Sequence, residues 1–219
     1  MIDFNLLVCS MPALLRGLLV TLKIAALGCT IGMSLGTLLG ILQALGPRIG
    51  RWIVTLYVTL IRGTPMLIQI ICVFYVLPQF GIRIPTFWAA TLAIGLNSAA
   101  YISQVIRSGI ASVSRGQIEA ARVLGLSNGT IIYLIILPQA VRAVLPALGN
   151  EFITLVKDSS LASTIGVAEL SKEGSLIRSR TLDAFTVFFG VALLYLIVTT
   201  ALSLCVAYLE RKMNPDAQN

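Results

Sequence analysis

The sequence predicts an all-α integral membrane protein with five transmembrane helices. Of its 219 residues, 57% are hydrophobic and only 11% are charged, whereas an ordinary soluble domain is roughly 25% charged. Several apolar segments reach the length of about 20 residues that a helix needs to cross a bilayer. The basic residues behind the formal charge of +7 are scattered at segment ends and form no stripe, which is typical of membrane loops and argues against a nucleic-acid partner.

The first two spans carry distinctive small residues. The first covers about residues 14–45, and within it a glycine recurs at every fourth position, which places four positions without a Cβ on one helix ridge and lets another helix approach closely. These glycines are Gly28, Gly32, Gly36 and Gly40. The second span covers about residues 52–78 and contains Pro65. A kink or break is expected there, because proline lacks the helical donor and clashes with the preceding turn.

The third and fifth spans differ in polarity. The third covers about residues 84–113 and carries Asn97, Tyr101 and Gln104 at i, i+4 and i+7, which places them on one helix face that should avoid lipid. The fifth covers about residues 184–209, is uniformly apolar and ends in basic residues. It is interpreted as a plain anchor.

The fourth span, about residues 141–160, is weak. It holds a short apolar run interrupted by Pro146, Gly149, Asn150 and Glu151. It must nevertheless cross. With the N-terminus outside, three spans bring the following long loop to the cytoplasm, and the C-terminus reaches the same side only if the total number of spans is odd. Such an interrupted crossing is stable only where protein shields it or where it lines a water-filled path.

The distribution of charge predicts the orientation. With the N-terminus outside and the C-terminus in the cytoplasm, seven basic residues fall inside and four outside, which agrees with the positive-inside rule. The inside set is Arg48, Arg51, Arg107, Arg115, Arg122, Arg211 and Lys212, and the outside set is Arg83, Lys172, Arg178 and Arg180.

The long cytoplasmic loop, about residues 114–138, predicts two short helices joined by a tight turn. Good helix formers precede Gly125, which suits a left-handed helix C-cap. Ser127 can then cap a second helix, and Pro138 is expected to limit its continuation. A knob of this shape is suited to a cleft in a soluble partner.

This loop carries a family pattern. Glu119-Ala120-Ala121, then Gly125, then Ile135-x-Leu137-Pro138 resembles the EAA loop of permease subunits of bacterial ABC importers. Further stretches resemble the polar amino acid branch, the histidine, arginine and glutamine permeases: residues 17–25, 61–65, 97–102, 148–150 and 157–161. The resemblance implies one transmembrane permease domain over residues 1–219, with the type I ABC importer fold, in the bacterial cytoplasmic (inner) membrane.

The resemblance also implies the partners. A second permease subunit, either an identical or a related chain, completes the path. Separate ATPase subunits hold ATP and Mg²⁺, and an extracytoplasmic binding protein delivers the amino acid, so this chain needs no cofactor. The expected ATPase-coupling residues are Glu119, Ala120, Ala121, Gly125 and Leu126. Glu119 either pairs with a basic group of the ATPase or caps its own helix.

Six polar residues are candidates for substrate binding, since polar groups near the middle of the membrane are costly in lipid. They are Gln69, Asn97, Tyr101, Gln104, Asp158 and Ser159, and the alternative is that they only hydrogen-bond between helices. The resemblance implies Glu at the position of Gln104, and the missing negative charge argues against a strongly cationic substrate. The alternative cargo is another small solute, such as methionine or an organic ion.

The sequence offers no sign of an enzyme. It contains no His, no Gly-x-Ser-x-Gly nucleophile motif, no nucleotide-binding loop and no metal-ligand spacing. No catalytic or metal-binding residue is therefore expected.

Overall fold

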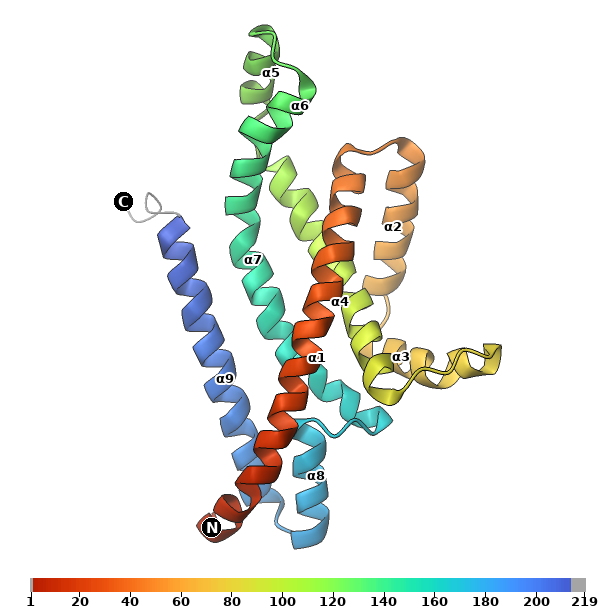
Figure 1. The fold of residues 1–219 in the computed structure, drawn as a ribbon, viewed down its shortest axis with the longest axis vertical. Coiled ribbons are helices and arrows are strands. Elements are labelled where there is room, and N and C mark those ends of the chain that lie inside the picture. The colour runs from red at the N-terminus through yellow and green to blue at the C-terminus, as the bar shows by residue number, and fades with distance from the viewer. Residues whose placement is uncertain (1, 214–219) are drawn as a thin grey trace.

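The computed structural model describes residues 2–213, and every regular element in that part of the chain is a helix (Figure 1). Most of the helices run along one long axis, with α8 and the N-terminus at one end and the α5–α6 knob at the other. In order, the elements are α1 (Phe4–Leu45), α2 (Arg48–Arg62), α3 (Met66–Ile71), the π-helix Cys72–Val76, the 3₁₀-helix Leu77–Phe80, α4 (Thr86–Ala111), α5 (Arg115–Val123), α6 (Asn128–Ile131), the π-helix Ile132–Ile136, α7 (Leu137–Asp158), the 3₁₀-helix Ser159–Ile165, α8 (Leu170–Thr181) and α9 (Ala184–Met213).

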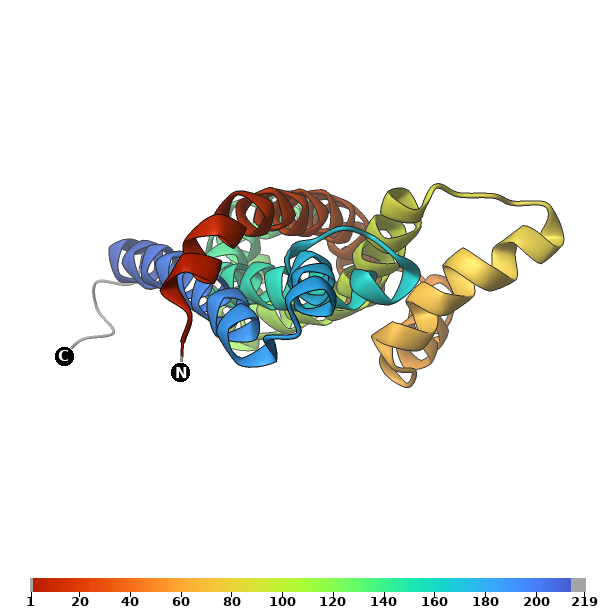
Figure 2. The same ribbon diagram turned by 90° about the horizontal axis from the view of Figure 1, so that it is seen from below.

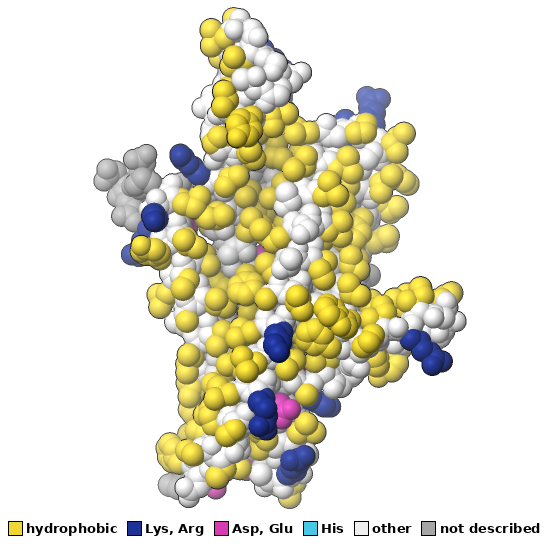
Figure 3. Space-filling model, in the orientation of Figure 1, with side chains coloured by type: hydrophobic (Ala, Val, Ile, Leu, Met, Phe, Trp, Pro, Cys, Tyr) yellow, Lys and Arg dark blue, Asp and Glu magenta, His cyan; other side chains and the backbone are white. Residues whose placement is uncertain are grey.

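Four helical segments are long and apolar enough to cross a membrane: Phe4–Leu45, Thr86–Ala111, Asn128–Ile165 and Ala184–Met213. A fifth crossing exists if the pair Arg48–Arg62 and Met66–Phe80 counts as one broken span. Figure 3 shows hydrophobic side chains over most of the face in view, with Lys and Arg gathered in its upper and lower parts. This surface is that of a membrane protein.

The break expected in the second span is confirmed and is sharp. The two halves are bent by 100°, and Pro65 stands immediately before α3. From below, the segment from α3 to Phe80 projects sideways from the bundle (Figure 2). Proline explains the position of the break, since it cannot donate the helical hydrogen bond and disfavours helix in the residue before it.

The glycine ridge of α1 lies against α4. A Cβ added at Gly32 would stand 2.9 Å from the Ser98 Cβ, and one added at Gly36 would stand 2.8 Å from the Ala99 carbonyl oxygen. The ridge therefore allows the two backbones to pack at a distance that no side chain would permit, as the sequence predicted.

The fourth span differs from its expected form. Instead of a short crossing that follows a knob ending at Pro138, the structure has a helical segment that runs unbroken from Asn128 to Ile165. Pro138 is tolerated because the preceding turns, Ile132–Ile136, are a π-helix. A wider turn removes the need for the i→i−4 hydrogen bond that proline cannot make.

A buried carboxylate joins the helices at the end of the bundle that contains α8. Glu169 is 0% exposed and caps α8 by accepting from the Ser171 N–H at 2.9 Å and the Lys172 N–H at 2.8 Å. It also accepts from the Tyr195 hydroxyl at 3.0 Å and the Thr21 hydroxyl at 3.4 Å. Burial raises the pKa of this carboxyl, and the four donors act against that rise. Helix α9 is thus more than the plain anchor expected, because its Tyr195 bonds to this carboxylate.

The α1–α4 contact can be tested with Gly36→Ala. The added Cβ would collide with the backbone oxygen of Ala99, so we expect the free energy of unfolding in detergent to fall by about 1–3 kcal/mol. Thermal unfolding of the purified protein measures the change. The matched control is Gly116→Ala, where the nearest atom is the Ser114 Oγ at 3.7 Å. Equal stability of the two variants would contradict the close approach.

The Glu169 network can be tested with Glu169→Ala. This change removes the cap of α8 and leaves the Thr21 and Tyr195 hydroxyls without this acceptor, so we expect a loss of about 2–4 kcal/mol in unfolding free energy. Glu169→Gln keeps one acceptor oxygen and should lose less. Arg180→Ala on the exposed side of the same helix serves as the control, and a loss as large there would count against the network.

Candidate functional site

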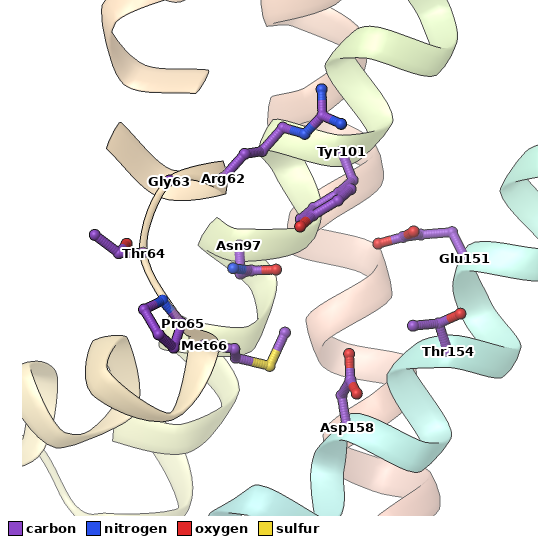
Figure 4. Close-up of a pocket in the computed structure, with 10 residues that line it drawn as sticks. All are labelled: Arg62, Gly63, Thr64, Pro65, Met66, Asn97, Tyr101, Glu151, Thr154 and Asp158. Carbon is purple, nitrogen blue, oxygen red and sulfur yellow. The ribbon is translucent and has the colours of Figure 1, made fainter. Parts of the chain in front are cut away.

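A polar cavity of about 510 Å³ opens between the break of the second span, α4 and α7 (Figure 4). Polar and charged side chains from these three elements line it together. Its lining residues are Arg62, Gly63, Thr64, Pro65, Met66, Asn97, Tyr101, Glu151, Thr154 and Asp158.

The break between α2 and α3 forms the first wall. Arg62 ends α2, and its guanidinium carbon lies 5.0 Å from the centroid of the Tyr101 ring, a distance at which a cation is attracted to the ring face. The break places the last residue of one helix and the start of the next at the cavity edge. An unbroken helix would have no such exposed turn there.

The Gln69 side chain hydrogen-bonds across this break. Its Nε2 donates to the Ile61 carbonyl at 2.8 Å and to the Thr64 Oγ1 at 2.9 Å. Its Oε1 accepts from the Asn97 Nδ2 at 2.9 Å. Gln69 thus supports the wall and does not line the cavity.

Helix α4 forms the second wall with two of its three predicted polar residues. Asn97 and Tyr101 line the cavity. Gln104, one turn further on, lies outside it, where its Nε2 donates to the Gln43 Oε1 at 2.7 Å and its Oε1 accepts from the Arg107 Nε at 3.1 Å. The polar stripe therefore has two parts, one at the cavity and one in a hydrogen-bonded chain that links α4 to α1.

Helix α7 forms the third wall. Glu151, Thr154 and Asp158 stand at i, i+3 and i+7 and line the cavity together, as side chains on one helix face do. The Glu151 Oε1 accepts from the Ser98 Oγ at 3.0 Å. Ser159 lies elsewhere, fully buried, with its hydroxyl donating to the Val156 carbonyl at 2.8 Å.

Seven of the ten lining residues were not among the candidates from the sequence, and four of these seven have polar side chains: Arg62, Thr64, Glu151 and Thr154. Glu151 entered only as one interruption of a weak span. Its spacing from Thr154 and Asp158 was the available signal, because i, i+3 and i+7 share one face of a helix. Arg62 had a signal too, because a charged residue within a predicted span is a candidate for function, but only the fold shows that it lies across the cavity from α7.

The cavity has opposite charges on opposite sides. In Figure 4, Arg62, Asn97 and Tyr101 lie on one side, and Glu151, Thr154 and Asp158 lie on the facing helix. A guanidinium binds carboxylates, and carboxylates bind ammonium groups, through charge-assisted hydrogen bonds. Such an arrangement can bind a small zwitterion lengthwise.

The loop knob has the expected turn. The Leu126 N–H donates to the Ala121 carbonyl and the Gly125 N–H to the Arg122 carbonyl, which is the Schellman pattern, and Gly125 has a φ of +78°. Ser127 caps α6 by accepting from the Thr130 N–H at 3.2 Å. Both local predictions from the sequence are confirmed.

The predicted coupling residues divide between the inside and the surface of the knob. Ala121 is 3% exposed and packs in a small core with Val113, Ile131 and Ile136. Glu119 and Ala120 are exposed. Glu119 lies well inside α5, whose N-cap residue is Ser114, so Glu119 does not cap that helix.

The chain is similar to known transport proteins over nearly its whole length. Residues 36–215 match the family model described as binding-protein-dependent transport system inner membrane component. The chain is 36% identical to the arginine transport system permease protein ArtQ of Bacillus subtilis (strain 168), over 98% of this chain and 99% of that protein. It is 38% identical to the glutamine transport system permease protein GlnP of Escherichia coli (strain K12), over 96% of this chain and 97% of that protein.

A solved structure gives the same result for the fold. A chain in the crystal structure of an amino acid ABC transporter with histidines has a TM-score of 0.92 to this chain at 37% identity, over 97% of this chain and 99% of that one. The relatives are permease subunits and not enzymes. The resemblance inferred from the sequence is confirmed: this chain belongs to the family of binding-protein-dependent transport system inner membrane components.

Proposed function

We propose that this chain is the membrane permease subunit of an ATP-driven importer of polar amino acids. The observation that carries the proposal is the cavity whose lining includes Arg62 on one side and Glu151 and Asp158 on the facing helix, because these charges match the two ends of an amino acid. Similarity to permeases named for arginine and glutamine supports the same class of cargo. ATP and Mg²⁺ act on separate ATPase subunits, and an extracytoplasmic binding protein delivers the substrate.

In this proposal the α-carboxylate of the substrate binds Arg62, and its ammonium group binds Glu151 and Asp158. Asn97, Tyr101 and Thr154 supply neutral hydrogen-bonding groups in the same cavity. The lining carries one cation and two acids, so neutral and cationic amino acids both fit its charge. The argument from Gln104 against a cationic substrate no longer applies, because Gln104 lies outside the cavity.

The other three candidates act indirectly in this proposal. Gln69 shapes the break through its bonds to Ile61 and Thr64. Gln104 ties α4 to α1, and Ser159 closes the end of α7. Their replacement should therefore change transport through the geometry of the cavity walls.

We further propose five spans, with the bent α2–α3 pair as the second, the N-terminus outside and the C-terminus in the cytoplasm. The basic residues near the knob and at the α1–α2 turn support this orientation, because cytoplasmic loops carry an excess of Lys and Arg. The knob and the α1–α2 turn lie at the same end of the molecule (Figure 1).

The knob is the proposed contact with the ATPase. Val123 and Leu124 at its tip are 88% and 79% exposed, and exposed apolar side chains of this size mark interaction sites when they cluster. Glu119 is free to meet a basic group of the partner. A second permease subunit, identical or related, completes the path beside the open cavity.

The decisive experiment is uptake by the complete complex in proteoliposomes with a panel of amino acids that each compete against one labelled substrate. Polar amino acids should compete and drive uptake. Competition by methionine or an organic cation alone would assign the chain to the alternative cargo.

The acidic wall can be tested with Asp158→Ala and Glu151→Gln. Each removes one partner of the substrate ammonium, so we expect the apparent affinity for uptake to weaken by about tenfold to a hundredfold while complex assembly is kept. The control is Glu173→Gln on α8, which removes a carboxylate outside the cavity. An unchanged transport affinity for the two cavity variants would remove these residues from the site.

The knob can be tested with Gly125→Leu. A left-handed backbone costs a residue with a side chain roughly 1–2 kcal/mol, so the turn should distort and ATP hydrolysis should become uncoupled from uptake. The reason is conformational, because a Cβ at Gly125 meets no atom within 4 Å. Gly129→Leu in α6 adds the same side chain where φ is not positive. Substrate-stimulated hydrolysis and uptake at normal rates in the Gly125 variant would exclude the coupling role.

A further inference from the structure

A seam between α7 and α9 contains two hollows that the transport cavity does not include. The inner hollow has a volume of about 250 Å³ and the outer hollow about 490 Å³. We define the lateral seam by their lining residues, which are Cys29, Met33, Leu145, Pro146, Leu148, Gly149, Val206, Leu209 and Glu210 for the inner hollow and Tyr133, Leu134, Leu137, Pro138, Val141, Arg142 and Met213 for the outer one.

The two hollows follow one another along the same pair of helices. Arg142 and Leu145 are one turn apart on α7, and Leu209 and Met213 are one turn apart on α9. The helices touch at the inner end, where a Cβ on Gly149 would stand 2.6 Å from Val206.

The inner hollow is almost entirely apolar and opens to the side. Apart from Glu210, all the residues that line it are hydrophobic or glycine. Leu209 is 49% exposed, and Val141 of the outer hollow is 42% exposed. In a protein that spans the membrane, an apolar slot of this kind faces the acyl chains of lipids.

The outer end of the seam is basic. Arg142 lines the outer hollow beside Met213, and Arg211 and Lys212 precede Met213 on exposed positions of α9. Glu210, which lines the inner hollow, is the one acid among these lining and flanking residues. Arg142 is the one charged residue in the lining of the outer hollow, which favours a negatively charged head group there, and basic pockets between spans at the membrane surface bind such lipids.

From this arrangement we propose that the lateral seam is a binding site for an anionic phospholipid. The phosphate lies beside Arg142, with Lys212 near the same end of the seam, and one acyl chain fills the inner hollow. A second copy of this chain is a poor occupant, because a twofold axis through the seam would set Arg142 of one copy near Arg142 of the other. The bound lipid would join α9 to the helix that carries the knob.

Native mass spectrometry of the purified complex tests the head-group part of the proposal. The protein is supplied with phosphatidylglycerol or with phosphatidylcholine of the same acyl chains, and retained lipid is counted. We expect selective retention of phosphatidylglycerol and a loss of about fivefold in its affinity for each of Arg142→Gln and Lys212→Gln. The matched controls are Arg48→Gln and Arg51→Gln at the start of α2, which lies at the same end of the molecule. Equal retention of the two lipids, or an equal loss in the controls, would mean ordinary surrounding lipid only.

A second pair of variants tests the acyl-chain part. Leu209→Trp fills the inner hollow and should reduce retention of phosphatidylglycerol, whereas Leu204→Trp, on a position of α9 that is 67% exposed and outside the seam, should not. Equal behaviour of the two variants would contradict the proposal. A disulfide between two copies through Val141→Cys would overturn it, because protein would then occupy the seam. Lipid retention needs no uptake, so this result is independent of the cargo proposed above.

Discussion

The side-chain amide of Gln69 is the interaction on which the cavity depends. The break between α2 and α3 frees backbone carbonyl groups, and each such group costs several kcal/mol if it is left without a hydrogen bond in an apolar environment. The Gln69 amide donates to two of them, the Ile61 carbonyl at 2.8 Å and the Thr64 carbonyl at 3.2 Å. The same side chain accepts from Asn97, so the residue that satisfies the freed carbonyls also connects the break to α4. This connection keeps the turn that contains Arg62 beside α4.

Two further contacts keep the rest of the bundle in place around this turn. The glycine ridge brings α1 against α4 at backbone distance, and the Glu169 carboxylate connects α1, α8 and α9 at one end. The ridge also adjoins the cavity wall, because Ser98, which packs on Gly32, donates to Glu151. The cavity is therefore bordered by helices that these contacts connect.

Features that depend on a few neighbouring residues could be predicted from the sequence. The break at Pro65, the turn at Gly125 and the cap at Ser127 follow from local backbone chemistry, and the glycine ridge follows from helical spacing. The path of the chain past Pro138 could not be predicted, because the π-helix that accommodates it is a response to packing. For the same reason the sequence suggested Asn97, Tyr101 and Asp158 for the cavity but not Arg62 or Glu151. Whether a polar side chain lines a cavity or bonds to a neighbouring helix, as Gln69 and Gln104 do, is decided by the partner that the fold brings to it.

The unbroken path from α6 to α7 has a mechanical consequence. Residues 128–158 form a continuous rod of about 45 Å that begins beside the Gly125 turn and ends at Asp158 in the cavity wall. Two places along this segment depart from regular α-helix, the π-helix at Ile132–Ile136 and the interior Pro146, since proline lacks the donor for the i→i−4 hydrogen bond. A movement of the knob would therefore reach Asp158 through a helix that can bend at both places, one near the knob and one between the knob and the cavity wall.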